Sequence, residues 1–248
     1  MTLLEVSHLA KRFGRIEAVA DVSFSIDSGE AIGLIGDNGA GKSTLVKMLS
    51  GVYRPTSGSI LLEGHEVRFS SPFAARSSGV EIIHQDLALC DDLDVASNIF
   101  LGREPRRSWG PLRLLDRKAM SRKAGKVMAE LGSRVSPDRL VAEMSGGERQ
   151  LVAAARALEF EPRVLLLDEP TAALSTDKIR VLMRLIEELK VRGVAIILIS
   201  HRFTDVLHVC DRVVVLQQGR VAGELVPSGE TPEQMMAKMH DMMTGVDA

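Results

Sequence analysis

Cysteine and long apolar runs are scarce in this sequence of 248 residues. Its two cysteines, Cys90 and Cys210, match neither a disulfide framework nor the C-x-x-C spacing of a zinc site, so we expect a reducing, cytoplasmic compartment. The longest apolar stretches, such as 194–199, fall well short of the roughly 20 residues that span a bilayer. The first residues lack the apolar segment of a signal peptide. We therefore expect neither a membrane span nor a signal peptide.

A strong excess of charge is also missing. The sequence has 31 Lys and Arg against 33 Asp and Glu, a formal net charge of −2. Such a balance gives no overall attraction for a polyanion, so any anion must be bound locally and we expect no nucleic-acid partner. Hydrophobic residues make up 45% and charged residues 26%, which is typical of a globular protein and argues against disorder.

The apolar pattern changes character along the first two thirds of the chain. One helix, from about Lys42 to Ser50, interrupts a series of short extended runs at 3–13, 19–26, 31–35, 59–62 and 80–84. Apolar residues then recur at spacings of three and four from 120 to 131, after a candidate N-cap at Asp116, which predicts an amphipathic helix. The stretch 103–115, rich in Arg, Pro and Gly, is interpreted as a linker.

Buried-strand patterns return in the last third. The runs 164–168 and 194–200 flank an amphipathic helix, and this order predicts a parallel crossover. Two further runs at 212–216 and 220–225 predict a hairpin. Thr231 and Gln234 are spaced as a capping box for a last helix. The whole pattern predicts an α/β protein.

The strongest chemical motif is G-x-x-x-x-G-K-S at 36–43, between the strand 31–35 and the helix that starts near Lys42. In such a loop the backbone N–H groups face phosphate oxygens, Lys42 reaches the β- and γ-phosphates and Ser43 ligates Mg²⁺. A dinucleotide site fits poorly, because Thr44 fills the third glycine position. The predicted nucleotide-binding residues here are Gly36, Asn38, Gly39, Ala40, Gly41, Lys42, Ser43 and Thr44.

Two acidic residues, Asp168 and Glu169, follow directly on the apolar run 164–167. Alone, this pattern is an ordinary transition from a strand to a loop. Beside a phosphate-binding loop it is a Walker B pattern, in which Asp168 orients Mg²⁺ and Glu169 acts as general base on the attacking water.

A third motif reads Met-Ser-Gly-Gly-Glu at 144–148. Ser145 and Glu148 alone are spaced as a capping box. Because Ser145 lies 103 residues after Lys42 and 23 before Asp168, the motif resembles the signature of ABC-transporter ATPase subunits. That family usually has Leu-Ser-Gly-Gly-Gln, so Met144 and Glu148 are departures. We expect Glu148 to turn back and cap the helix, since its charge would otherwise oppose nucleotide phosphates.

The resemblance implies further site residues. Gln85 resembles the Q-loop glutamine that touches Mg²⁺ or water and links the ATP site to the helical subdomain, and His201 resembles the histidine that contacts the γ-phosphate. Phe13 resembles the aromatic residue that stacks on adenine, with core packing as the alternative. The implied catalytic residues are Glu169, His201, Gln85 and Lys42; the implied metal ligands are Ser43, Gln85 and Asp168; Ser145, Gly146 and Gly147 would face the γ-phosphate bound by a second copy of the chain.

The resemblance also implies an architecture: a P-loop NTPase core with an antiparallel β subdomain and an inserted helical subdomain. We expect residues 1–86 and 159–248 to form the nucleotide-binding core and 87–158 the helical subdomain. Ser175 stands where many members have aspartate, and importers of simple sugars often depart from the family pattern at this point. The stretches 37–60 and 85–104 are similar to those of ribose, xylose and fructose importer ATPases.

Several expectations follow from that similarity. The implied function is ATP hydrolysis, with ATP and Mg²⁺, that energises uptake of a simple sugar. The implied partners are a second copy in an ATP-sandwich homodimer, membrane permease subunits and, indirectly, a periplasmic sugar-binding protein, at the cytoplasmic face of the bacterial inner membrane. The alternatives are another small solute, an exporter, nucleotide binding without hydrolysis, or a mechanical ATPase of the kind that acts in DNA repair. A mechanical ATPase of this kind usually carries a coiled-coil insertion or two ATPase domains, and this sequence shows neither feature.

Overall fold

The computed structural model describes residues 1–83, 89–109, 112–171, 175–200, 202–227 and 231–244. The chain divides into two compact units. The first comprises Met1–Ile82, Pro162–Glu169 and Ile186–Ala248, and the second comprises Ile83–Glu161 and Pro170–Leu185. Within the described ranges, no helix combines the length and the apolar character needed to cross a bilayer.

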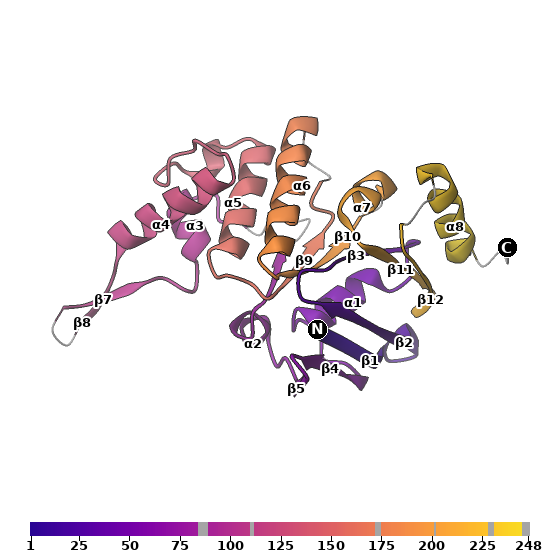
Figure 1. Ribbon diagram of the computed structural model, residues 1–248. Coiled ribbons are helices and arrows are strands. Elements are labelled where there is room, and N and C mark those ends of the chain that lie inside the picture. The colour runs from indigo at the N-terminus through magenta and orange to yellow at the C-terminus, as the bar shows by residue number, and fades with distance from the viewer. Residues whose placement is uncertain (84–88, 110–111, 172–174, 201, 228–230, 245–248) are drawn as a thin grey trace. The chain divides into compact units, whose positions relative to one another are not determined.

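One mixed sheet forms the centre of the first unit (Figure 1). Its order over the described residues is β5-β4-β1-β2-β12-β11-β3-β10-β9-β6. The antiparallel arm consists of β1 (Thr2–Phe13), β2 (Ile16–Asp27), β4 (Ser57–Leu62) and β5 (His65–Val67). The other part consists of β3 (Ala31–Gly36), β6 (Val80–Ile83), β9 (Val164–Asp168), β10 (Ala195–Ile199), β11 (Arg212–Gln217) and β12 (Arg220–Leu225).

Parallel pairing brings the ends of three buried strands to one edge of the sheet. β10 lies between β3 and β9, with Ile199 opposite both Leu34 and Asp168. All five residues of β10 are buried, as their continuous apolar sequence requires of a strand covered on both faces. The parallel crossover predicted from 164–200 is thereby confirmed, and the phosphate-binding loop follows β3 at the same edge.

The described helices that lie wholly in the first unit are α1 (Lys42–Leu49), α2 (Pro72–Ser77), α7 (Phe203–Val209) and α8 (Pro232–Thr244). The capping box predicted for α8 is present, with Thr231 N donating to Gln234 Oε1 at 2.9 Å and Gln234 N to Thr231 Oγ1 at 3.3 Å. α2 and α7 were not predicted, because each is too short to show a period in apolar residues. A local signal for α2 exists, since Ser71 caps it and Pro72 is its first residue.

The hairpin between β11 and β12 differs slightly from the sequence prediction. Gln217 belongs to the strand and pairs with Arg220, which leaves a two-residue turn of Gln218 and Gly219. Both have positive φ, 46° and 76°, as a type I′ hairpin turn requires.

The second unit contains α3 (Val95–Phe100), α4 (Arg117–Glu130), a short 3₁₀ turn (Val141–Glu143), α5 (Gly146–Leu158) and the first part of α6 (Thr176–Val191). The helix predicted after Asp116 is confirmed as α4: Asp116 Oδ1 accepts from Ala119 N at 3.0 Å. The buried face of α4 is Met120, Ala124, Val127 and Met128.

The linker interpretation of 103–115 was wrong. Residues in this stretch form an antiparallel pair, β7 (Arg106–Trp109) and β8 (Leu112–Leu115), with Arg106 opposite Leu115. Arginine-rich composition misled the prediction, because an exposed two-stranded hairpin does not need the strict apolar alternation of a strand that covers a core.

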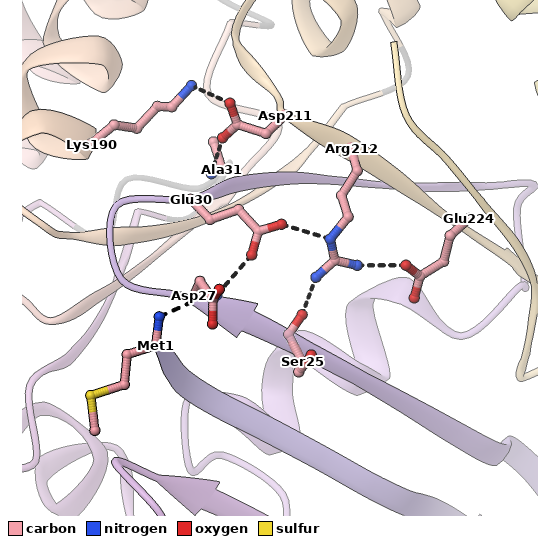
Figure 2. Close-up of polar contacts among 9 residues, drawn as sticks. All are labelled: Met1, Ser25, Asp27, Glu30, Ala31, Lys190, Asp211, Arg212 and Glu224. Carbon is pink, nitrogen blue, oxygen red and sulfur yellow. Dashed lines mark hydrogen bonds and ion pairs between the residues drawn. The ribbon is translucent and has the colours of Figure 1, made fainter. Parts of the chain in front are cut away.

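Arg212 connects four segments of the first unit (Figure 2). Its guanidinium donates to Glu30 Oε1 at 2.6 Å, to Glu224 Oε2 at 2.7 Å and to the carbonyl oxygen of Ser25. Desolvation favours the neutral guanidinium, but hydrogen bonds to Glu30 and Glu224 and their charges outweigh it, so the pKa of Arg212 lies above its ordinary value. The neighbouring Asp211 accepts from Ala31 N at 2.8 Å and pairs with Lys190 at 3.0 Å.

We expect Arg212→Met to lower the free energy of unfolding by about 2 kcal/mol, because Glu30 would keep a largely buried charge without its partner. Urea unfolding followed by circular dichroism measures the change. The matched control is Arg68→Met, which breaks an exposed ion pair with Glu66 and should cost less than about 0.5 kcal/mol. Equal losses in the two variants would contradict a stabilising role for the Arg212 cluster.

Candidate nucleotide site

The loop between β3 and α1 can be built only with glycine at two positions. A Cβ on Gly36 would lie 2.3 Å from the carbonyl oxygen of Leu216, and one on Gly41 would lie 2.7 Å from that of Ala18. Gly41 also has a φ of 103°. Gly39 has a φ of 86° and open space around it, so it needs glycine only for its conformation. These glycines let the backbone curl tightly before α1 begins.

The other loop residues differ in exposure. Asn38 and Ser43 are exposed, Thr44 is half-buried, and the buried Ala40 accepts a hydrogen bond from Gly219 N at 3.0 Å. Gly41 is the N-cap of α1 and has no side chain to cap the helix. Backbone N–H groups of the first turn are therefore not used by a cap, and a helix start of this kind favours an anion.

Lys42 lies close to the acidic residues at the end of β9. Its Nζ donates to the carbonyl oxygens of Gly36 at 2.5 Å and Asp37 at 3.0 Å. Burial lowers the pKa of Lys42, and the nearby charges of Glu169, Asp37 and Asp168 partly oppose that shift. The loop lysine and the acidic pair, 126 residues apart in sequence between Lys42 and Asp168, thus share one electrostatic environment.

Glu169 has an unusual backbone conformation. Its φ is 52°, in the left-handed region that costs free energy for residues other than glycine, and its N–H donates to the carbonyl oxygen of Ile199 at 2.9 Å. The side chain is half-buried. Strained conformations of this kind cluster at functional sites, so the backbone agrees with the role predicted for this residue.

Phe13 is the last residue of β1, and the residue is 41% exposed. It contacts Tyr53 edge to face, with ring centroids 5.1 Å apart, and Lys11 Nζ lies 5.1 Å from its centroid. The contact with Tyr53 was not predicted, because the two residues are 40 positions apart and share no motif. A partly exposed aromatic ring is more consistent with stacking on a base than with packing in the core.

The capping role predicted for Glu148 is confirmed. Ser145 is the N-cap of α5, its N–H donates to Glu148 Oε2 at 2.8 Å, and Glu148 N donates to Ser145 Oγ at 3.3 Å. Gly146 and Gly147 form the first turn, and space is open around Gly146. The buried Met144 directly precedes the N-cap Ser145.

Arg139 was missed by the sequence analysis. Its Nη1 donates to Glu148 Oε1 at 3.0 Å and its Nη2 to the carbonyl oxygen of Glu143 at 2.6 Å. Hydrogen bonds from Ser145 and then the charge of Arg139 hold the pKa of Glu148 below its ordinary value. The negative charge that departs from the usual signature is therefore matched by a cation from the preceding loop.

Three predicted positions cannot be compared with the structure. Gln85, His201 and the segment 172–174 lie outside the described residues. Ser175, which directly precedes α6, is exposed.

The family model for ABC transporters matches residues 19–172, more than half of the chain. The chain belongs to the ABC transporter family. It is 42% identical over 218 residues to a putative ribose/galactose/methyl galactoside import ATP-binding protein of Agrobacterium fabrum, a match covering 88% of this chain and 42% of the relative. It is 44% identical over 241 residues to the ribose import ATP-binding protein RbsA 1 of Burkholderia cenocepacia, covering 96% and 46%. The chain thus spans less than half the length of these relatives.

Solved structures agree with this assignment. A nucleotide-free ATP-binding cassette from an ABC transporter superposes with a TM-score of 0.83 at 26% identity, covering 98% of both chains. A second ABC-transporter cassette, in an ADP conformation, gives a TM-score of 0.79 at 26% identity, covering 99% of this chain and 96% of the other. The predicted ABC ATPase fold is confirmed.

Proposed function

We propose that this chain binds and hydrolyses ATP with Mg²⁺ and that this hydrolysis energises uptake of a simple sugar by an ABC importer. The observation that carries the proposal is the shared electrostatic environment of Lys42, Asp168 and Glu169 beside a loop that only glycine can build. The names of the relatives, which are import ATP-binding proteins for ribose and related sugars, support the sugar.

In this proposal the phosphates lie against the N–H groups of the loop and the start of α1. Lys42 stabilises the β- and γ-phosphates, and Glu169 accepts a proton from the attacking water. Phe13, with its exposed ring held by Tyr53, stacks on the adenine. Gln85 and His201, by family resemblance, complete the catalytic residues.

Mg²⁺ fits the donors that this part of the chain offers. Ser43 has an exposed hydroxyl in the first turn of α1, and Asp168 ends the neighbouring β9, so both supply the hard oxygen atoms that Mg²⁺ prefers. Gln85 is the third proposed ligand. Bound there, the ion would neutralise charge on the transferred phosphate.

The signature residues act on a second nucleotide site. Ser145, Gly146 and Gly147 would contact the γ-phosphate that Lys42 of a second copy binds, so two cassettes sandwich ATP. The further proposed partners are permease subunits at the cytoplasmic face of the membrane and a periplasmic sugar-binding protein. We also propose that residues 1–86 and 159–248 form the nucleotide-binding core and 87–158 the helical subdomain.

Transport and hydrolysis can be tested separately. ATP hydrolysis is measured on the purified chain, and uptake of labelled ribose, xylose, fructose and galactose is measured in cells that lack the gene. We expect these cells to lose the uptake of one simple sugar. The wild-type gene should restore that uptake, and the Glu169→Gln variant should not. If the uptake of every simple sugar is normal and the uptake of another solute is lost, only the sugar assignment is overturned. A chain that neither binds nor hydrolyses ATP would overturn the whole proposal.

Arg139 gives a prediction specific to this signature. Arg139→Met should lower the rate of ATP hydrolysis about tenfold, because the charge of Glu148 would no longer be matched beside the incoming phosphate, a cost of about 1.4 kcal/mol. The affinity of the phosphate-binding loop that contains Lys42 for ATP should not change. Steady-state kinetics and nucleotide titration separate the two quantities.

A second substitution identifies the cause. Glu148→Gln keeps the capping geometry without the charge, since glutamine also completes a capping box. We expect the double variant Arg139→Met with Glu148→Gln to recover most of the lost rate. A double variant as slow as Arg139→Met would show that Arg139 acts through the fold and not through charge.

A further inference from the structure

Positive charge is concentrated in one short part of the second unit. Residues 103–126 contain nine of the 31 Lys and Arg and only two of the 33 Asp and Glu. The rest of the chain therefore has 22 basic and 31 acidic residues, a net charge of −9. The overall charge of −2 conceals this asymmetry, which is a local electrostatic feature of the surface.

Six of these nine side chains are exposed and form no salt bridge with a described residue; we call them the basic surface: Arg106, Arg107, Arg113, Arg117, Lys118 and Arg122. Among the other three, Lys123 pairs with Glu159 at 3.1 Å and Lys126 lies 3.9 Å from Glu130. Glu104 lies near Arg106, and its pKa is lowered mainly by backbone hydrogen bonds and in small part by that charge. The segment thus pairs some of its cations by salt bridges, whereas the salt bridges among the described residues include none from the basic surface.

The basic surface comes from two adjacent elements, the hairpin and α4. Asp116 N donates to the carbonyl oxygen of Pro105 at 2.8 Å, so the base of the hairpin closes where α4 begins. Figure 1 shows the hairpin extending from that point, away from the helices of its unit. On α4, Lys118 and Arg122 are one turn apart on the side opposite to the buried Met120 and Ala124.

Two features of the basic surface are unfavourable for the chain alone. Arg117 and Lys118 occupy the first turn of α4, where the helix dipole disfavours cations, and that turn has no acidic residue. Leu115, opposite Arg106 in the hairpin, is 48% exposed. An external anionic surface with an apolar layer beneath it would satisfy both the cations and the leucine.

We propose that the basic surface docks on the anionic phospholipid headgroups of the membrane in which the permease lies. This inference rests on the proposed function, because it assumes a cassette that works at a membrane. In the register of the hairpin, Arg106, Arg113 and Leu115 lie on one face and Arg107 on the other, because successive strand residues alternate between faces. A bilayer presents a continuous layer of anionic headgroups that a protruding hairpin and the adjacent start of α4 can both contact. The rest of the sequence has a net charge of −9 and so gives no attraction for an extended polyanion such as DNA beyond the basic surface.

The test uses the full purified chain and two kinds of vesicle: phosphatidylcholine alone, and phosphatidylcholine mixed with phosphatidylglycerol. We expect the chain to sediment only with the anionic vesicles, and less at high salt. The triple variant Arg106→Glu, Arg107→Glu, Arg113→Glu should bind these vesicles about 100-fold more weakly or worse. A second variant, Lys118→Glu with Arg122→Glu, reverses charge on α4 alone and should also weaken binding.

The matched control reverses three exposed arginines outside the basic surface, Arg68, Arg184 and Arg192, with the same change in net charge. It should bind anionic vesicles no more than about threefold more weakly than the wild type. Thermal unfolding and basal ATP hydrolysis should be unchanged in the hairpin variant, which separates this proposal from the catalytic one. Three results would each overturn the membrane assignment: no binding of the wild-type protein to anionic vesicles, an equal loss of vesicle binding in the control variant, or preferential binding of duplex DNA.

Discussion

Glu169→Gln will slow ATP hydrolysis about 10²- to 10⁴-fold while ATP still binds. The substitution removes the carboxylate that accepts the proton and keeps the size of the side chain. It also leaves the hydrogen bond from the backbone N–H to Ile199 and the residues that bind phosphate. Hydrolysis is measured by phosphate release, and ATP affinity by calorimetric titration.

The chain offers a close control for this variant. Glu161 is an exposed glutamate that also has a positive φ, 47° against 52° for Glu169. Glu161→Gln makes the same chemical change in the same backbone conformation, and it should leave hydrolysis within about twofold of the wild type. A Glu169→Gln enzyme that retains more than about a third of the wild-type rate would remove Glu169 from the role of general base.

Local patterns predicted the parts of the site that are themselves local. The loop glycines lie between a buried strand and a helix, and close backbone contacts at Gly36 and Gly41 require them, so sequence and structure agree there. The capping geometry of Ser145 and Glu148 also followed from their spacing alone. In each case the interacting groups are separated by only a few residues.

Contacts between distant segments could not be predicted in this way. Arg212 and Glu30 are 182 residues apart, and Phe13 and Tyr53 are 40 apart, so no motif connects them. Arg139 is nearer to Glu148, but its direction depends on the loop that precedes α5. The β7–β8 hairpin was missed for a different reason: the side chains of its strands that the structure describes are exposed or half-buried, and their polar composition does not show the pattern of a strand that covers a core.

Lys42→Ala should weaken ATP binding at least tenfold, because a charge-assisted contact to the β- and γ-phosphates is worth about 1.5 to 3 kcal/mol. Lys42 is half-buried, and its ammonium group donates hydrogen bonds to the carbonyl oxygens of Gly36 and Asp37 in the loop. The substitution should therefore leave the packing of the hydrophobic core unchanged. Equilibrium titration with a fluorescent ATP analogue measures the change. The control is Lys47→Ala, an exposed lysine in the last turn of the same helix that contacts Tyr53 and not the loop. Unchanged ATP affinity in Lys42→Ala would count against the phosphate-binding loop.

The same variant tests whether two cassettes share each site. Ser145→Arg fills the open space at the start of α5 and should abolish turnover on the site of its partner, whereas Lys42→Ala damages the site on its own chain. In a mixed dimer both lesions fall on one site and the other site is intact. Because equal mixing of a twofold dimer makes half of the dimers mixed, we expect about a quarter of the wild-type rate to return. Each variant alone should stay near zero, and a mixture no faster than the separate variants would contradict the shared site. Full ATP hydrolysis by a preparation that sediments as a monomer would contradict it equally.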